Sequence, residues 1–564
     1  MDVAIEQDVT GIRCYANPEN WTSISCQFKM MFSDFIVEEL DSNGVVTLWP
    51  LNGVEEILIH DVKNGKLDGN EKIVISGIEN EKELETKELE LPKGLTAEHI
   101  ASIGKLEKGD TVVIDVNGLE KTERGEIHKY FKSSSQKLST KTSEDTIIVS
   151  IANNNDRKRR HWPDDVPNYC HFTLSKENKD TSYAIREIAT KCGLNMKLFS
   201  FSGNKDRRGI TSQRVSAFRV QIEKLKKISE CIKSIRLHNF EYRDNQLGLG
   251  DNIGNRFQII LRDVGNEITL DDIKKRCEGT NKYGFLNYFG HQRFGTLGIS
   301  TAEIGRLILR KDFQTAIDKI LSSKKEMSRE TFQEALLSYG EDRDAKKAFG
   351  LIKGNGKKYS IEGTLLKALI NKNANPQSAL LSLPRETISL YIHAFQSYLF
   401  NEVISQRIEK YGPVILKGDI GEDGKPLTDD ASIFDICIPL VSTEMDFPEN
   451  ETKEMIEKLM EKYEIKAENF TVLSKHLMVS KVLRRMFKKP KDLIDCDIIK
   501  YSNEKSIIQR ELINGPDEVV EDTKYVAIKL TFSLDAGDYA TMLLREILRF
   551  NVDKESQKNM IKSI

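Results

Sequence analysis

Short stretches in which hydrophobic and polar residues alternate predict β-strands near both ends of the chain. The clearest is residues 32–40, which contain Phe35-Ile36-Val37-Glu38-Glu39 and are followed by the turn signal Ser42-Asn43-Gly44 and the β-rich residues 45–48. Strand character returns in residues 198–201, 215–222, 257–262 and 525–532. The N-terminal half and the C-terminal end are therefore both expected to contain strands.

Helical periodicity marks other parts of the chain. Residues 182–194 predict an amphipathic helix, because apolar residues recur three or four positions apart and Gly193 provides a stop. The helical period dominates residues 300–501, where apolar residues at four-residue spacing are interpreted as core positions. Residues 539–550 predict a final helix.

Polar and basic segments interrupt this pattern. Lys, Glu, Gly and Ser dominate residues 64–145, which we interpret as a surface insertion, partly helical and partly mobile. The basic run at residues 157–160 fits a nuclear-import signal, a phosphate contact or a solvated loop. Arg484-Arg485 and Lys488-Lys489 form a second basic patch that could meet RNA.

Composition indicates a globular protein with more than one core. The chain has 564 residues, 39% hydrophobic and 30% charged, which predicts about two to four domains. A formal net charge of -3 excludes a basic protein overall but not a local basic groove. The eight cysteines lack metal-ligand spacing and fit a reducing compartment. No signal peptide or membrane span is predicted, so we expect a soluble, intracellular protein.

Residues 201–213, with the sequence Phe-Ser-Gly-Asn-Lys-Asp-Arg-Arg-Gly-Ile-Thr-Ser-Gln, contain the most informative chemistry. They place Asp206 between Lys205 and the pair Arg207-Arg208. Neighbouring cations favour an ionised carboxylate, which suits nucleophilic attack on a polyanionic substrate. A solvated salt-bridge partner is the ordinary alternative. From this segment alone both interpretations stay open.

Four blocks, in this order, resemble those of the TruD family of pseudouridine synthases. Residues 28–39 resemble an opening lysine followed by D-F-x-V-x-E, and the Asp206 segment resembles the G-x-K-D-[RK] turn that carries the family's catalytic aspartate. Residues 287–295 resemble N-Y-F-G-x-Q-R-F-G, and residues 532–546 resemble F-x-L-x-x-G-x-[YF]-A-T with L-R-E. Together the blocks are far more specific than any one alone.

Further segments of the chain resemble one branch of this family, and its length fits that branch. Residues 121–128, 140–142 and 169–181 are similar to the eukaryotic branch, whose members are called pseudouridylate synthase 7. The resemblance implies an α+β fold with a discontinuous catalytic domain built on an antiparallel sheet with helices. Residues 1–295 would form its first part, including the insertion, and residues 503–564 its return. Residues 296–502 would form an inserted α/β TRUD domain, with RNA in the cleft between the two domains.

The resemblance also implies roles for single residues. Asp206 would be the nucleophile or initiating carboxylate, and Lys29 would pair with it and keep it ionised. Phe289 would stack on a uracil flipped out of the RNA, and Asn287 could form a hydrogen bond in the same pocket. Core packing is the ordinary alternative for Phe289, and a solvated side chain is the alternative for Lys29.

Three further positions in these blocks are basic. By the same resemblance, Arg207 and Arg293 are candidate phosphate or structural ligands for RNA. His291 occupies a variable position of the family, and we assign it no catalytic role.

The implied function is isomerisation of uridine to pseudouridine in tRNA, at position 13 of the D-arm, with precursor tRNA, snRNA and mRNA as further substrates. A C1′–N1 bond is replaced by a C1′–C5 bond without oxidation, so we expect no cofactor and no metal. Residues 354–358 lack P-loop spacing, in agreement with this expectation. We expect RNA as the partner, a monomer, no membrane association, and residence in the nucleus with the cytoplasm as a second compartment.

Two other function classes remain. A non-catalytic RNA-binding protein or tRNA chaperone would use the same cleft without chemistry. A hydrolase with Asp206 as nucleophile would need a water-activating partner, which the sequence does not reveal.

Overall fold

A computed structural model describes most of the chain. The described residues are 10–45, 91–106, 110–133, 138–143, 145–151, 162–295, 300–322, 330–353, 360–371, 375–443, 449–471, 482–501 and 524–552. The chain divides into two compact units. One comprises Met1–Ile57 with Pro167–Ile564, and the other is Leu58–Val166. Each unit is described by itself.

A ten-stranded sheet runs through the first unit. Its main order is β10-β7-β9-β2-β11-β17-β16, and short strands β1, β3 and β8 pair with β11, β2 and β9. The strands are β1 (Gln27–Phe28), β2 (Phe35–Asp41), β3 (Gly44–Val45), β7 (Tyr169–Glu177), β8 (Phe199–Phe201), β9 (Ile210–Phe218), β10 (Ile235–Arg243), β11 (Gly254–Arg262), β16 (Asp495–Tyr501) and β17 (Tyr525–Asp535). The C-terminal strand β17 thus lies inside a sheet that the N-terminal half begins.

One strand pair, β2 with β9, is parallel, and the other pairs of this sheet are antiparallel. Ile36 lies opposite Ile210 at the start of this pairing. A Cβ atom on Gly209 would lie 2.4 Å from the carbonyl oxygen of Phe35. Glycine at this position therefore allows β9 to approach β2 directly after the segment that carries Asp206.

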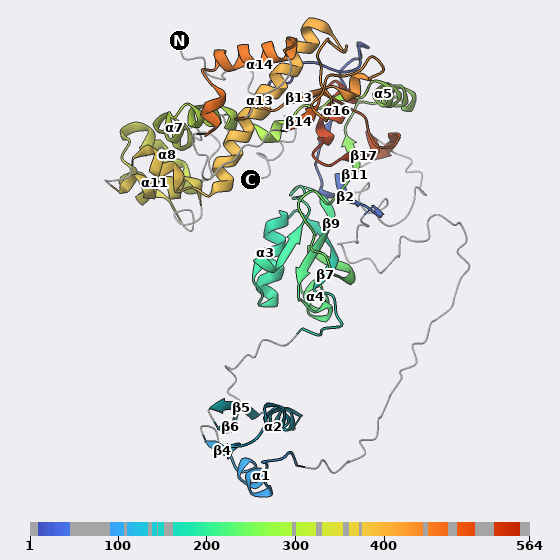
Figure 1. The fold of residues 1–564 in the computed structure, drawn as a ribbon. Helices are drawn as coiled ribbons and strands as arrows, with labels where there is room; N and C mark the ends of the chain where they lie inside the picture. The colour runs from blue at the N-terminus through green and yellow to red at the C-terminus, as the bar shows by residue number, and fades with distance from the viewer. Residues whose placement is uncertain are drawn as a thin grey trace, which may run out of the picture. The chain divides into compact units, whose positions relative to one another are not determined.

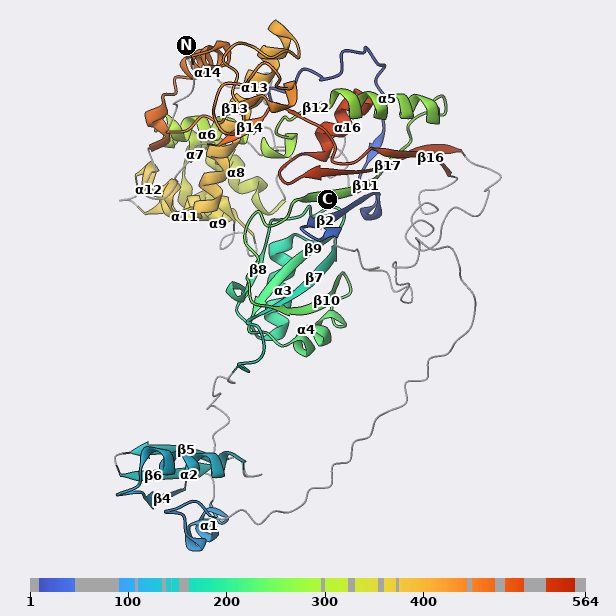
Figure 2. The ribbon, with the colours of Figure 1, turned by 45° about the vertical axis from the view of Figure 1, so that its right-hand side comes forward.

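Two pairs of helices cover parts of the sheet. The helices α3 (Thr181–Cys192) and α4 (Ile222–Ser229) share a core with β7, β9 and β10 (Figure 1). The helices α5 (Leu270–Tyr283) and α16 (Ala540–Leu548) pack against each other beside β11 and β17 (Figure 2). The apolar residues of α3 that recur three or four positions apart are buried, as the sequence predicts. The helix ends at Gly193, which has the left-handed αL conformation, also as predicted.

Helices dominate residues 300–471 of the same unit. They are α6 (Thr301–Leu309), α7 (Phe313–Ser322), α8 (Glu330–Asp342), α9 (Ala345–Leu351), α11 (Ile361–Ile370), α12 (Pro376–Leu381), α13 (Arg385–Tyr411) and α14 (Glu451–Lys462). Phe395, Leu399 and Val403 of α13 are buried, which confirms their prediction as core positions. Two small sheets pair β12 (Phe285–Leu286) with β15 (Phe487–Lys488) and β13 (Cys437–Pro439) with β14 (Leu483–Arg485).

The α+β fold class is confirmed, while some element boundaries differ from the prediction. Residues 215–222 were expected to be a strand, but strand β9 begins earlier, at Ile210, and ends at Phe218. It cannot continue to residue 222, because Ile222 already begins α4. Strand β16 lies within residues 296–502 and nevertheless belongs to the main sheet. The boundaries proposed for the inserted TRUD domain stay a prediction.

The second unit has a sheet that the sequence did not reveal. It comprises α1 (Ala97–Ile103), β4 (Thr111–Asp115), α2 (Lys121–Ser133), β5 (Leu138–Ser143) and β6 (Thr146–Ile151), with antiparallel order β4-β6-β5. Ile114, Ile127 and Ile147 are fully buried in its own core. The high content of polar residues concealed the alternation of apolar and polar residues in these strands. Residues 64–90 and the basic run at 157–160 lie outside the described residues.

Candidate active site

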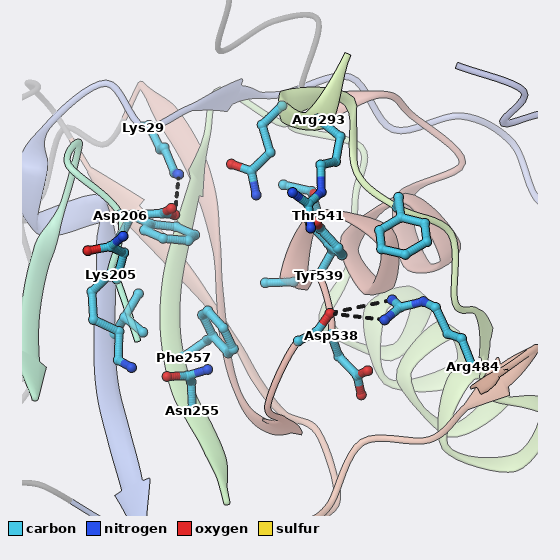
Figure 3. Close-up of a pocket in the computed structure, with 17 residues that line it drawn as sticks. Lys29, Lys205, Asp206, Asn255, Phe257, Arg293, Arg484, Asp538, Tyr539 and Thr541 are labelled. Carbon is cyan, nitrogen blue, oxygen red and sulfur yellow. Dashed lines mark hydrogen bonds and ion pairs between the residues drawn. The ribbon is translucent and has the colours of Figure 1, made fainter. Parts of the chain in front are cut away.

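Asp206 lies on the loop between β8 and β9, at one side of a cavity of about 370 Å³. Its side chain is 36% exposed, so it is accessible from the cavity. Lys205 points the other way (Figure 3), because its ammonium forms an ion pair of 2.6 Å with the buried carboxylate of Glu39. The side chains of these two neighbours therefore point in opposite directions. Both residues line the cavity, but the Lys205 ammonium is paired with Glu39, whereas the Asp206 carboxylate is exposed.

Lys29 supplies the cation beside Asp206. Its Nζ atom lies 3.1 Å from Oδ2 of Asp206 and 3.6 Å from the centre of the Phe35 ring (Figure 3). The residue follows β1 directly and is 8% exposed. Because the ammonium is surrounded by aromatic carbon and one carboxylate, its attraction to Asp206 is screened less than at an exposed surface.

The cavity is lined by aromatic rings, amides and cations. The lining residues are Lys29, Phe35, Val37, Asn204, Lys205, Asp206, Asn255, Phe257, Phe289, Gln292, Arg293, Arg484, Gly537, Asp538, Tyr539, Ala540 and Thr541. The volume falls within the range of small-ligand sites. A planar base with polar edges matches flat apolar walls that carry amide donors and acceptors.

Two neighbouring strands provide one aromatic wall. Phe35 and Val37 are alternate residues of β2, and Asn255 and Phe257 are alternate residues of β11, so each pair points to one face of the sheet. Phe257 stacks on Phe532 of β17 at 5.5 Å between ring centres. This ring is therefore held in place by the strand that returns from the C-terminal end.

Phe289 forms part of the opposite wall. The guanidinium of Arg484 lies 4.3 Å from the centre of its ring, and the ring of Phe400 meets it edge-on at 5.3 Å. Asn401 of α13 accepts a hydrogen bond from the main-chain N–H of Phe289 and donates one to its carbonyl. The orientation of the Phe289 ring is thus fixed by both its side chain and its backbone.

Asn287 lies behind this wall and is not among the lining residues. Its amide nitrogen donates to the carbonyl of Arg485 at 2.9 Å, and its amide oxygen accepts from Arg484. The amide oxygen thus orients Arg484, which covers Phe289, while the amide nitrogen bonds the backbone of Arg485. A contact between this amide and a base stays a prediction.

The basic candidates differ in position. Arg293 lines the cavity, with its guanidinium 5.7 Å from the Phe289 ring. Arg207 is exposed and is not a lining residue. His291 is buried and bonded to Asn551, away from the cavity lining.

Asp538 is an unexpected carboxylate at the edge of the cavity. Its side chain is only 2% exposed, with Lys488 Nζ at 3.7 Å. Burial raises the pKa of Asp538 to about 6, and the charges of Lys488 and Arg484 oppose this rise. The residue stands between Gly537 and Tyr539 of a recognised block, at a position to which the sequence assigned no role.

Sequence analysis also missed Asn255, Phe257 and Phe35 as lining residues. Part of their signal was present, because residues 257–262 were expected to form a strand. Alternation along β11 would have placed Asn255 and Phe257 on one face. What the sequence could not supply was the side of the sheet on which the Asp206 loop lies.

Within the described ranges, no group of three His, Cys, Asp or Glu side chains is arranged to hold a metal ion. Of the described helices, none has the length and apolar character needed to cross a bilayer.

Comparisons with known proteins identify relatives of this chain. Residues 137–547 match the family model of tRNA pseudouridine synthase D (TruD). The chain is 28% identical to a human pseudouridylate synthase 7 homolog, over 94% of this chain and 79% of the human one. It is also 28% identical to the multisubstrate pseudouridine synthase 7 of Schizosaccharomyces pombe, over 99% of this chain and 92% of the yeast protein.

A solved structure shows the same fold. The crystal structure of a TruD protein from Methanosarcina mazei aligns with a TM-score of 0.55 and 17% sequence identity, covering 98% of this chain and all of that one. At this identity the match is evidence for the fold alone.

Proposed function

Because the chain belongs to the TruD family of pseudouridine synthases, we propose that it isomerises uridine at position 13 in the D-arm of tRNA, with Asp206 as the nucleophile. The enzyme class, an isomerase that makes pseudouridine in RNA, follows from the family. The observation that supports the role of Asp206 is its carboxylate at 3.1 Å from Lys29, facing an aromatic cavity.

The chemistry uses one carboxylate twice. Asp206 attacks the target nucleotide, the C1′–N1 bond breaks, the uracil turns over in the cavity, and a C1′–C5 bond forms as the carboxylate leaves. The hydrogen on C5 is lost to water, and N1 gains a proton. Since nothing is oxidised or reduced, the reaction needs no redox cofactor.

Uracil must leave the RNA stack before Asp206 can reach it. Flipping a base costs a few kcal/mol, and stacking on an aromatic side chain returns about 1–3 kcal/mol per base. Phe289 is the proposed stacking residue, and Phe257 on the facing wall offers a second ring. Arg293 and Arg207 are the proposed phosphate contacts, the first in the cavity and the second on the exposed loop.

The range of substrates is also a proposal. The similarity to a yeast enzyme called multisubstrate pseudouridine synthase 7 favours more than one RNA, so we include precursor tRNA, snRNA and mRNA. These substrates would place the protein in the nucleus as well as the cytoplasm. A monomer is the proposed state.

Tritium release from C5-labelled uridine tests this proposal. The full chain and its Asp206→Asn variant are incubated with a tRNA transcript, and with a matched transcript whose target uridine is replaced by cytidine. Release by the wild type on the uridine transcript alone, with none from Asp206→Asn, supports the nucleophile and the target together. Binding of the transcript by Asp206→Asn should stay within about threefold, because phosphate contacts dominate affinity.

A non-catalytic tRNA chaperone is the rival proposal. It predicts equal refolding of a misfolded transcript by wild type and Asp206→Asn, with tritium release from neither. Both activities can coexist, so refolding by the variant does not exclude the enzyme, whereas absence of release by the wild type on every bound RNA does.

A further inference from the structure

Lys176 is a buried lysine that does not enter the cavity. It lies on β7, its residue is 1% exposed, and its Nζ atom donates three hydrogen bonds. The acceptors are the main-chain carbonyl oxygens of Lys179 at 2.7 Å, Lys205 at 3.4 Å and Asp206 at 3.0 Å. The ammonium therefore lies directly behind the backbone of the proposed nucleophile.

Keeping a charge at this position is costly. Removing an ammonium from water requires compensation by strong hydrogen bonds or an opposite charge. Burial lowers the pKa of Lys176 to about 8, the carboxylates of Asp206 and Asp180 oppose this change, and the Lys205 ammonium adds to it. An apolar side chain at this position would avoid the desolvation cost of a buried ammonium. The presence of lysine therefore indicates that its three hydrogen bonds have a purpose.

Two of the three acceptors flank Asp206 in the chain. The Lys205 carbonyl belongs to the peptide unit that enters Asp206, and the Asp206 carbonyl belongs to the unit that leaves it. Holding both units fixes the φ and ψ angles of Asp206 and so the direction of its Cα–Cβ bond. The carboxylate is then directed toward Lys29 before substrate binds.

Other contacts hold the loop at different points. Thr181 Oγ1 accepts from the N–H of Lys205 at 3.0 Å, Gln213 donates to the carbonyl of Gly203 at 2.9 Å, and the N–H of Asn178 donates to the carbonyl of Gly209 at 3.1 Å. These contacts hold the loop on both sides of Asp206, at Gly203, Lys205 and Gly209. The bond from Lys176 reaches the Asp206 backbone itself.

We propose that Lys176 is a positioning residue of the isomerase, which holds the Asp206 backbone so that the carboxylate meets C1′ of the target nucleotide. This inference rests on the proposed function of Asp206. It assigns no contact between Lys176 and RNA. A misplacement of about 1 Å at a reacting group can lower a rate about 100-fold. Loss of the Lys176 hydrogen bonds should therefore lower kcat and leave KM nearly unchanged.

The test compares Lys176→Met, which keeps length but removes every donor, with Lys176→Arg, which keeps a cation with several donors. Lys191→Met is the matched control, because Lys191 is an exposed lysine on α3. Tritium release is measured at several RNA concentrations, well below the melting midpoint of each variant. We expect kcat of Lys176→Met to fall about 10- to 100-fold with KM within about twofold. Lys176→Arg should retain more turnover, and Lys191→Met should match the wild type.

The pH profile separates positioning from simple packing. A neutral lysine amine has two N–H donors for three carbonyls, so kcat of the wild type should fall as pH rises through about 8. Arginine stays charged at these pH values, so Lys176→Arg should lack this fall. The charges that face Lys176, on Asp206, Asp180 and Lys205, are present in both proteins.

Each outcome decides the matter. No release by the wild type on any bound RNA overturns the proposed function, and this inference with it. Release by the wild type together with an unchanged kcat in folded Lys176→Met overturns the inference alone. So does a loss confined to KM, or an alkaline fall that is the same in Lys176→Arg. If Lys176→Met does not fold, the kcat and pH profile of Lys176→Arg decide.

Discussion

At the scale of single residues, the site combines backbone strain with an ion pair. Lys29 has φ of 55°, in the left-handed region that is costly for a residue with a side chain. This conformation, directly after β1, directs its ammonium onto Asp206 and over the Phe35 ring. The strain is thus located at the residue that pairs with the proposed nucleophile, as is typical of functional sites.

Substitution of Phe289 should affect turnover more than stability. Phe289→Leu removes the flat face offered to the base, and we expect kcat to fall at least about 10-fold while RNA affinity changes less than about threefold. Phe400→Leu is the matched control, because this buried ring packs on Phe289 but does not line the cavity. Both variants should lose about 1–1.5 kcal/mol of unfolding free energy in urea titrations. Equal turnover of the two variants would show that Phe289 serves the core.

The buried carboxyl group of Asp538 should lower the free energy of unfolding in a pH-dependent way. The folded protein raises the pKa of this carboxyl to about 6 from an ordinary 3.8 by burial, so between these values the folded state holds a proton that the unfolded state has lost. The free energy of unfolding therefore decreases as pH rises from about 4 to about 6. Asp538→Asn should be more stable than the wild type at pH 7.5, by roughly 1–3 kcal/mol, and equally stable near pH 4.

Asp535 provides a control of opposite sign for this prediction. Burial alone would raise the pKa of Asp535, but hydrogen bonds from Lys488 and Lys491 lower it. Asp535→Asn should therefore be less stable than the wild type at pH 7.5. Urea midpoints of both variants at the two pH values provide the measurement. A gain for Asp538→Asn that is the same at pH 4 and pH 7.5 would exclude the titration of this group as its cause.

At the scale of elements, local periodicity predicted helices and strands better than their pairing. The α3 helix and the alternating residues of β2 depend on nearby residues, and both were predicted from the sequence. The start of β2 was not, because Phe32–Asp34 form a 3-10 helix and the strand begins at Phe35 instead of at residue 32. The parallel pairing of β2 with β9 and the place of β16 in the main sheet depend on contacts between distant segments, which one sequence does not encode locally. For the same reason the sequence did not reveal that Asn287 bonds Arg484 and Arg485, which come from a strand almost 200 residues away.

Asn401 links three such distant elements. From α13 its fully buried amide bonds both main-chain groups of Phe289, at 2.9 and 3.0 Å, and the carbonyl of Thr10 at 2.8 Å. Asn401→Ala removes three buried hydrogen bonds, so we expect a loss of about 2–4 kcal/mol in the free energy of unfolding. The Phe289 wall should also loosen, so kcat should fall more than KM rises.

Asn371→Ala is a suitable comparison for Asn401→Ala, because Asn371 is an exposed asparagine at the end of α11. It should change the free energy of unfolding measured in urea by less than about 0.5 kcal/mol. A wild-type midpoint for Asn401→Ala would mean that water replaces its hydrogen bonds at no cost, contrary to the assignment of Asn401 as a link between elements.

At the scale of the whole molecule, the chain has separate cores in two units. The main unit combines a sheet core with the helices of residues 300–471, whereas Ile114, Ile127, Ile147 and Val149 form a core within Leu58–Val166. Sequence analysis expected this region to be a polar insertion, because charged residues outnumber the few apolar ones that make its core. A small core can still fold when its strands and helices enclose it fully.

Separate cores predict separate unfolding. Ile147→Ala removes a fully buried side chain from β6, which should cost the smaller unit about 2–4 kcal/mol. Ile259→Ala makes the same change in β11 of the main sheet. In native-state hydrogen exchange, Ile147→Ala should lower the protection of peptides from β4 to β6 and leave those from β9 and β11 unchanged, and Ile259→Ala should do the reverse. A loss of protection that spreads through both units in either variant would show that the units unfold together. In that case tritium release by Ile147→Ala would fall as its stability falls. With separate unfolding, its tritium release stays at the wild-type rate.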